Sequence, residues 1–344
     1  MRKILAAIIT VIIFLLGFFY WGILPREPSS NKTIIFAVQK GEGDEEISAN
    51  LEKEGIIKNR YFFQMYVLTQ GKTTKLQAGK YELSPRMNIP EIVNKFVLGD
   101  VLKEKITIIE GWNLRDIGWY FENKGMFMTE EFFEIAGFPL IDYSKNTDLP
   151  FPKDYSQQFE FLADKPKNVG LEGYLFPDTY EISAQDDIEK IIKRILANFD
   201  KKLTPDLKKE IIAQKKTIFE IITMASLLEK EVKTLEDKKI VSGIFWKRIK
   251  SSKPLQSCAT INYITGKNDR GALLEDIEID SPYNTYKYYG LPLGPISNPG
   301  LDSILAAIYP TETNYLYYLS TPDGKTIFSK TFKEHSAAQS KYLK

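Results

Sequence analysis

The sequence predicts an α+β protein with a single membrane-spanning helix near its N-terminus. Three observations support this fold class. An uncharged apolar run covers Ile4–Leu24, which is long enough to cross a bilayer at a helical rise of about 1.5 Å per residue. Beyond it, short strand-like segments alternate with amphipathic helical patterns. A strand–helix–helix pattern also occurs twice, which indicates a duplicated module rather than a solenoid.

Length and composition limit the classes of function. The 344 residues suggest two or three domains, and 43% hydrophobic residues can build a sizeable core. With 46 Lys and Arg against 45 Asp and Glu, the net charge of +1 offers no basic field for nucleic acid. The single cysteine, Cys258, and the single histidine, His335, argue against a disulfide framework and against Cys- or His-rich metal sites. We therefore expect no metal.

The apolar run has the flanks of a membrane anchor. Arg2 and Lys3 precede it, and Tyr20 and Trp21 lie near its far end. Positive residues before a first span favour a cytoplasmic N-terminus, and aromatic residues are typical of the membrane interface. A cleaved signal peptide is the alternative, but the run is long and no small-residue cleavage site follows it. The expected segments are a cytoplasmic end at 1–3, a transmembrane helix at 4–24, a linker at 25–32 and an extracytoplasmic remainder.

The two copies of the repeated pattern are offset by 70 residues. Gly41 and Gly55 of the first copy correspond to Gly111 and Gly125 of the second. In each copy a strand is followed by a Gly turn, an amphipathic helix closed by Gly and a second helix. We assign the second copy and the region that connects it onward to residues 104–167.

The segment between the copies completes the first one. Residues 79–83 predict a strand, and residues 89–98 predict a helix ended by Gly99. The resulting order of strand, two helices and returning strand resembles the LysM-like modules of cell-wall proteins, which we place at 33–103. The resemblance implies binding of glycans that contain N-acetylglucosamine. A purely structural role is the alternative.

The stretch Thr217–Val232 predicts a helix with a buried stripe that includes Ile221 and Leu228. Glu229 and Glu231 close the apolar run. Because a helix turns about 100° per residue, their carboxylates point about 200° apart and cannot share one proton. A carboxyl at the edge of an apolar stripe has a raised pKa, as a general acid at neutral pH requires. The alternative is a solvated helix end whose glutamates pair with the neighbouring lysines, Lys230 and Lys233.

A long stretch punctuated by Pro and Gly follows, from residue 255 to residue 300. It carries neutral amides, hydroxyls and aromatic rings, as a sugar-binding cleft requires, and long ordered loops usually carry function. An earlier segment at 171–180 is dense in aromatic residues, Gly and Pro, and predicts a fixed turn rather than a regular element. The candidate substrate-binding residues are Tyr174, Gln256, Ser257, Thr260, Tyr283, Asn284, Thr285 and Asn298.

Six motifs in this order resemble the YceG-like family, the membrane-anchored endolytic murein (lytic) transglycosylases of bacteria. They are LEGYLFPDTY at Leu171, MASLLEKE at Met224, LQSCAT at Leu255, SPYNTY at Ser281, GLPLGPISNPG at Gly290 and FSKTFKEH at Phe328. The resemblance covers essentially the whole chain. It implies a mixed α+β catalytic domain at 168–344 with a lysozyme-like catalytic helix.

By its place in the motif, the resemblance puts the catalytic acid on Glu231 and leaves Glu229 a secondary, tuning role. Val232 departs from the Ser or Thr that follows the acid in lysozyme-like lytic enzymes, and some relatives have Asp-Pro where this chain has Cys258-Ala259. The implied reaction cleaves the MurNAc–GlcNAc bond and leaves 1,6-anhydro-MurNAc ends, without a cofactor. The implied partners are peptidoglycan glycan strands, the cytoplasmic membrane and a cell-wall synthase, with no nucleic acid.

Two other functions stay open at this point. A muramidase-type hydrolase would need a second carboxylate to activate water, and the candidates within the motifs are Glu172, Asp178 and Glu229. A non-catalytic cell-wall scaffold would bind glycan through the LysM-like module alone.

Overall fold

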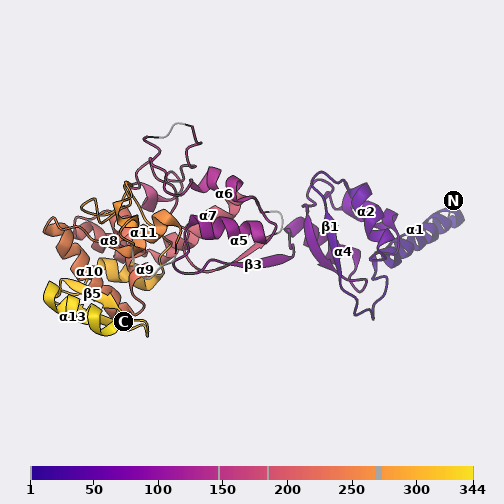
Figure 1. Ribbon diagram of the computed structural model, residues 1–344. Helices are drawn as coiled ribbons and strands as arrows, with labels where there is room; N and C mark the ends of the chain where they lie inside the picture. Colours follow the sequence, from indigo (N-terminus) through magenta and orange to yellow (C-terminus); the bar gives the residue numbers. More distant parts are fainter. Residues whose placement is uncertain (1, 146–147, 184–185, 268–272, 344) are drawn as a thin grey trace. The chain divides into compact units, whose positions relative to one another are not determined.

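The computed structural model describes residues 2–145, 148–183, 186–267 and 273–343, so Met1 of the expected cytoplasmic end lies outside the described residues. The protein is of mixed α+β class, with small two-stranded sheets among many helices (Figure 1). It divides into two compact units, Met1–Lys105 with Glu181–Asp186 and Ile106–Tyr180 with Asp187–Lys344.

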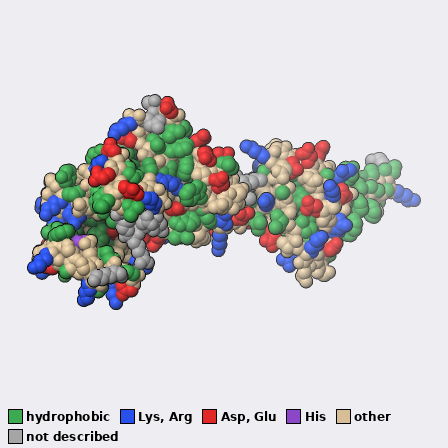
Figure 2. Space-filling view, in the orientation of Figure 1, with side chains coloured by type: hydrophobic (Ala, Val, Ile, Leu, Met, Phe, Trp, Pro, Cys, Tyr) green, Lys and Arg blue, Asp and Glu red, His purple; other side chains and the backbone are tan. Residues whose placement is uncertain are grey.

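Helix α1 (Arg2–Ile23) coincides with the expected membrane span to within two residues. It is the one helix in the described chain that is long and apolar enough to cross a membrane. Its hydrophobic side chains are largely exposed, as Figure 2 shows at the end of the molecule that carries the N-terminus.

The rest of the first unit is a two-stranded sheet covered by helices. Strand β1 (Ile34–Val38) pairs antiparallel with β2 (Gly79–Leu83), with Ile34 opposite Leu83 and Val38 opposite Gly79. Alternate residues of both strands face a core shared with the helices. The sequence prediction for β2 and for the helix at 89–98 is confirmed residue by residue. The helices are α2 (Asp44–Lys53), α3 (Arg60–Thr69) and α4 (Ile89–Leu98).

The second copy of the repeat has the same elements. It contains β3 (Lys103–Thr107), α5 (Leu114–Asn123) and α6 (Thr129–Ala136). Gly41 and Gly111 both take positive φ, 93° and 79°, so the predicted glycine turns are present.

The duplication extends further than the sequence indicated. Strand β4 (Thr179–Ser183) forms a sheet with β3, as β2 does with β1, and α7 (Ile188–Lys202) follows β4 as α4 follows β2. An insertion that contains the short 3₁₀ helix η1 (Glu160–Leu162) separates α6 from β4. The fixed turn predicted at 171–180 therefore holds only in part, because a strand begins at Thr179.

The remaining helices surround α9 (Ile218–Glu231), which packs against α8, α10, α11 and α12 (Figure 1). The structure differs from the sequence pattern here in three ways: residues from Cys258 form a helix rather than a loop, the helix that the pattern predicts at 306–310 begins already at Leu301, and the pattern does not predict α13. The elements are α8 (Pro205–Ala213), α10 (Leu235–Lys250), α11 (Cys258–Thr265), η2 (Asp276–Glu278), α12 (Leu301–Ile308), β5 (Tyr317–Ser320), β6 (Thr326–Ser329) and α13 (Phe332–Tyr342).

Candidate active site

Helix α9 is buried on every side between Ile221 and Leu228. Its N-terminus is closed by a capping box between Thr217 and Glu220. Small side chains allow its neighbours to come close: Ser226 Oγ accepts a hydrogen bond from the Ile296 N–H at 3.0 Å. The Pro- and Gly-rich loop before α12 is thereby fixed to the middle of α9.

Glu231 is the last residue of α9 and is half-buried. Ser257 Oγ donates a hydrogen bond to Glu231 Oε1. The Tyr318 hydroxyl and the Ala259 N–H also hydrogen-bond the carboxyl group. Ser320 Oγ donates to the backbone carbonyl of Glu231 at 3.1 Å. Residues of α11, its N-cap and β5 therefore converge on the end of α9.

The environment of Glu231 favours a protonated carboxyl. Removal from water raises its pKa above the ordinary value, and this effect outweighs the hydrogen bonds from Ser257, Tyr318 and Ala259 and the positive charge of Arg248, all of which lower it. A carboxyl whose pKa is raised, and which is surrounded by donors that stabilise its anion, can both give and take a proton.

Arg248 holds the surroundings of Glu231 together. Its guanidinium donates to the carbonyls of Leu255 at 2.8 Å and Leu316 at 3.0 Å. One side chain of α10 therefore links the segment before Ser257 to the segment before β5, which carries Tyr318.

A buried hydroxyl network positions Ser257. The Ser257 N–H donates to Thr285 Oγ1 at 3.1 Å, and Thr260 Oγ1 lies 3.0 Å from the same atom and donates to the Ser257 carbonyl at 2.8 Å. All three side chains are at most 1% exposed. The structure therefore brings these three predicted residues to Glu231, Ser257 directly and the two threonines through it.

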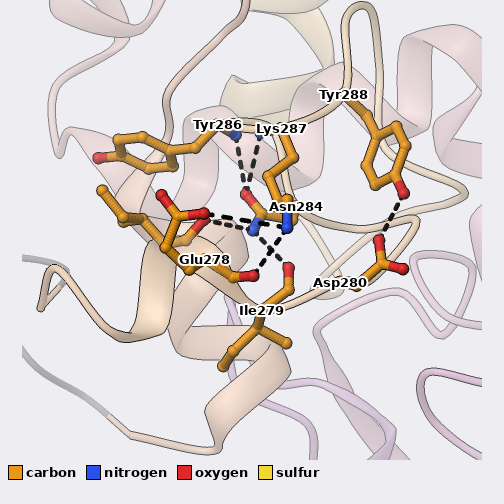
Figure 3. Close-up of polar contacts among 8 residues, drawn as sticks. Glu278, Ile279, Asp280, Asn284, Tyr286, Lys287 and Tyr288 are labelled. Carbon is orange, nitrogen blue, oxygen red and sulfur yellow. Dashed lines mark hydrogen bonds and ion pairs between the residues drawn. The ribbon is translucent and has the colours of Figure 1, made fainter.

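Asn284 is fully buried and organises the loop on which Thr285 lies. Its Nδ2 donates to the carbonyls of Ile277 at 2.9 Å and Ile279 at 2.8 Å, while its Oδ1 accepts from the Tyr286 N–H at 2.9 Å. Figure 3 shows these bonds converging on one amide. All of the recorded partners of Asn284 are backbone groups of its own loop.

Gln256 is the one predicted binding residue whose side chain is exposed. Its φ is 52°, in the left-handed region that non-glycine residues rarely adopt, and its N–H donates to the Thr285 carbonyl at 3.0 Å. Gln256 directly precedes Ser257, so its exposed amide side chain comes from the same backbone segment that brings Ser257 to Glu231.

The other predicted binding residues are buried away from solvent. Tyr174 packs between Phe161 and Phe199, with ring centroids 6.1 and 5.7 Å away. Tyr283 packs on Tyr263, and Asn298 accepts a hydrogen bond from the Leu175 N–H at 2.8 Å. The recorded contacts of Tyr174, Tyr283 and Asn298 are with the protein core and loop backbone rather than with Glu231.

Glu229 faces another side of α9. Its Oε2 accepts from Ser303 Oγ at 2.6 Å and from the Gly300 N–H at 3.0 Å, at the N-terminus of α12. Lys238 Nζ lies 3.2 Å from both carboxylate oxygens of Glu229. The Glu229 side chain is only 9% exposed and the Lys238 side chain only 5%. The alternative of two solvated glutamates that pair with Lys230 and Lys233 is therefore wrong.

The two other candidate second carboxylates have structural partners. Glu172 is buried and accepts from the Leu114 N–H and from the Tyr263 hydroxyl at 3.0 Å. Asp178 Oδ1 accepts a hydrogen bond from the Thr179 N–H at the start of β4, and Asp178 Oδ2 lies 3.5 Å from Lys202 Nζ. Neither arrangement offers a partly exposed base beside Glu231.

Glu172 predicts a pH-dependent stability. Burial raises its pKa to about 8, against 4.5 in the unfolded chain. The folded protein therefore binds more protons between these values, and the free energy of unfolding should fall as pH rises, by up to about 1.4 kcal/mol per pH unit. Urea unfolding across this range should show the slope, and Glu172→Gln should flatten it. An equal slope in the variant would contradict the assignment.

Tyr318, Arg248 and the Ala259 N–H were missed from the sequence. The sequence pattern predicts a strand at 316–320, which contains Tyr318, and a helix at 236–250, which contains Arg248. Nothing in their local pattern distinguishes them from ordinary core residues, because only the tertiary fold brings β5 to the end of α9.

Comparisons with known proteins agree with the motifs. The YceG-like family matches residues 36–341. The endolytic murein transglycosylase of Bacillus subtilis (strain 168) is 33% identical over 332 residues, which cover 95% of this chain and 90% of that protein. The endolytic murein transglycosylase of Streptococcus pneumoniae (serotype 2, strain D39) is 31% identical over 91% of this chain, which spans 59% of that longer protein.

A solved structure supports the same relationship. The crystal structure of a YceG-like protein from Listeria monocytogenes is 32% identical, with a TM-score of 0.59 over 90% of this chain and all of that one. With a family match over most of its length and a curated relative at this identity, the chain belongs to the YceG-like family.

Proposed function

We propose that this protein is an endolytic lytic transglycosylase that cleaves the MurNAc–GlcNAc bond of peptidoglycan and leaves 1,6-anhydro-MurNAc ends. The observation that carries the proposal is the setting of Glu231, a half-buried residue whose carboxyl has a raised pKa and accepts hydrogen bonds from hydroxyl and backbone amide donors. Its curated relatives are named endolytic murein transglycosylases.

One carboxyl group suffices for this reaction. Protonated Glu231 gives its proton to the glycosidic oxygen, and the bond to C1 breaks. The resulting carboxylate takes the proton of the MurNAc C6 hydroxyl, whose oxygen closes onto C1. Ser257, Tyr318 and the Ala259 N–H stabilise the carboxylate between these steps. Gln256, exposed and next to Ser257 in the chain, is the residue we expect to hydrogen-bond the glycan directly.

The proposed site of action is the outer face of the cytoplasmic membrane. Helix α1 would be a single-pass anchor with a cytoplasmic N-terminus, as Arg2 and Lys3 before the apolar run favour. Tethered there, the enzyme would cut nascent strands beside a cell-wall synthase and limit their length. The module at 33–103 would assist capture of the glycan.

The end groups of the products separate this proposal from its alternatives. The full chain, reconstituted in vesicles, is incubated with isolated peptidoglycan, and the new ends are identified by mass spectrometry. We expect 1,6-anhydro-MurNAc ends. Reducing MurNAc ends would indicate a hydrolase, and the absence of new ends would indicate a binding scaffold.

Tyr318→Phe should shift the pH dependence of the reaction. In the parent protein, the hydrogen bond from the Tyr318 hydroxyl lowers the pKa of Glu231. Removing the hydroxyl should therefore raise the pKa of Glu231 further. A general acid acts while it is protonated, so the alkaline limb of the rate profile should move up by about one pH unit. The phenyl ring keeps its packing on Phe245. A limb that stays in place or moves down would exclude Tyr318 as a partner of the catalytic acid.

A further inference from the structure

The exposed face of α3 is apolar. Tyr61, Met65 and Leu68 are 58%, 51% and 70% exposed, and their spacing places them in one stripe along the helix. Phe63 and Val67, on the other side, are fully buried in the core of the first unit. A helix that is apolar on both sides is usually covered on both sides, yet the described chain covers only one.

The membrane helix packs on α3 beside this stripe. The Phe62 ring contacts the Phe18 ring at a centroid distance of 5.3 Å. Gly22 permits a close approach, since a Cβ there would lie 2.3 Å from the Phe62 ring. Lys58, just before α3, donates to the Trp21 carbonyl at 2.8 Å and lies 4.4 Å from the centre of the Trp21 ring. A set of specific contacts therefore joins α3 to the end of α1.

These contacts set the depth of α3. Phe18 precedes Leu24, the end of the apolar run, by six residues, or about 9 Å along a helix. The run is about as long as the hydrocarbon core is thick, so Phe18 lies below the lipid surface when α1 spans the membrane. Phe62 touches Phe18, and the first turn of α3 must therefore reach the lipid boundary as well.

We propose that α3 is a membrane-contacting helix whose Tyr61, Met65 and Leu68 side chains insert into the interface of the bilayer that α1 crosses. The proposal rests on the proposed anchoring by α1 and is independent of the chemistry of Glu231. Apolar side chains on one face of a helix bind the boundary between headgroups and acyl chains.

The charges around the stripe suit a lipid surface. Lys58 and Arg60 lie at the N-terminal end of α3, where α1 leaves the membrane, and Arg26 donates to the Ile57 carbonyl at 3.2 Å close by. Basic residues with long stems are favoured at this depth because their charged ends reach anionic headgroups. The contact would fix the first unit directly on the membrane instead of leaving it on a free tether.

A fluorescence experiment on the full chain tests the proposal. Cys258, the only cysteine, is replaced by Ser, and Met65→Cys or Ala37→Cys is introduced and labelled with an environment-sensitive dye. Ala37 is the matched control, because it is exposed on β1 between the inward-facing Phe36 and Val38 and so lies on the sheet surface that faces away from the helices. The protein is reconstituted in vesicles of phosphatidylglycerol and phosphatidylethanolamine.

We expect lipids with a nitroxide near the headgroup to quench the dye at Met65 and not at Ala37, and aqueous iodide to do the opposite. Two further substitutions, Met65→Glu and Leu68→Glu, should weaken lipid quenching of a dye at Tyr61→Cys. Iodide quenching at Met65 equal to that at Ala37 would overturn the proposal. Protection of the Met65 dye from both quenchers would also overturn it, in favour of a second copy or another protein on this face.

Two readouts separate this proposal from the proposed α1 anchor and from the proposed reaction. Failure of the chain to float with the vesicles would refute the α1 anchor, and the α3 contact with it. Lipid quenching at Met65 in a chain that yields no anhydro ends would refute the proposed reaction and leave the membrane contact standing.

Discussion

Glu231→Gln should abolish the release of anhydro-ended products while the protein remains folded. Glutamine keeps the size and one acceptor of the side chain but cannot exchange a proton at neutral pH. General acid–base catalysis contributes about 10²–10⁴-fold, and because Glu231 would serve in both halves of the reaction, the loss should be at the upper end of this range or beyond. The rate of product formation on isolated peptidoglycan measures it.

Folding should survive this substitution. A neutral amide adds no buried charge, and it can still accept a hydrogen bond from Ser257. Thermal melts of the variant and the parent are the control. A folded Glu231→Gln protein with more than about one hundredth of the parent rate would show that the acid lies elsewhere.

Glu229→Ala should cause the largest loss of stability. It leaves Lys238, with only 5% of its side chain exposed, without the carboxylate that it contacts, and removes the acceptor for the Gly300 N–H at the start of α12. Breaking a buried ion pair on one side costs about 3–5 kcal/mol. Urea unfolding of the variant against the parent measures the loss.

A matched double variant shows whether the buried charge of Lys238 causes the loss of stability. Glu229→Gln with Lys238→Met removes both charges and keeps an acceptor for Ser303, so it should recover much of the lost stability. Its folded fraction should turn over glycan, because the hydrogen-bond partners of Glu231, which are Ser257, Ala259 and Tyr318, lie on other elements. If the double variant folds normally but is inactive, Glu229 takes part in the chemistry.

Local signals in the sequence predicted the regular elements that carry their own caps. Helix α4 has the predicted bounds: Gly99, which ends the predicted helix, closes it with a φ of 64°, and the structure adds a capping box between Asn88 and Glu91 at its start. Helix α9 is likewise bounded by Thr217 and Val232, the ends of the predicted segment. The stripe on α9 then placed two carboxylates on different faces, which is what the structure shows.

Elements capped from a distance could not be predicted in the same way. The hydroxyl of Ser257, the N-cap of α11, makes no cap hydrogen bond and instead donates to Glu231. The N–H of Gly300, the N-cap of α12, donates to Glu229, which is 71 residues away. The local sequence therefore predicts loop at the first residues of both helices. The contacts of Ser257 with Glu231 and of Gly300 with Glu229 also hold these two carboxylates in place.

The polar residues of the long loop were predicted as a set, but their individual roles depend on burial. The Gln256 side chain is exposed to solvent, while the side chains of Asn284 and Thr285 form hydrogen bonds with other groups of the protein. An amide that binds a sugar and an amide that closes a loop have the same sequence signal. Only the fold separates them.

Cleavage in heavy-oxygen water tests most directly whether Glu231 serves as both acid and base without a water nucleophile. Isolated peptidoglycan is digested with the reconstituted chain, and the new MurNAc ends are analysed by mass spectrometry. Intramolecular attack by the C6 hydroxyl predicts ends that carry no heavy oxygen, with their formation lost in Glu231→Gln. Heavy oxygen at C1 of the new ends would show that water attacks, and would contradict the proposed reaction.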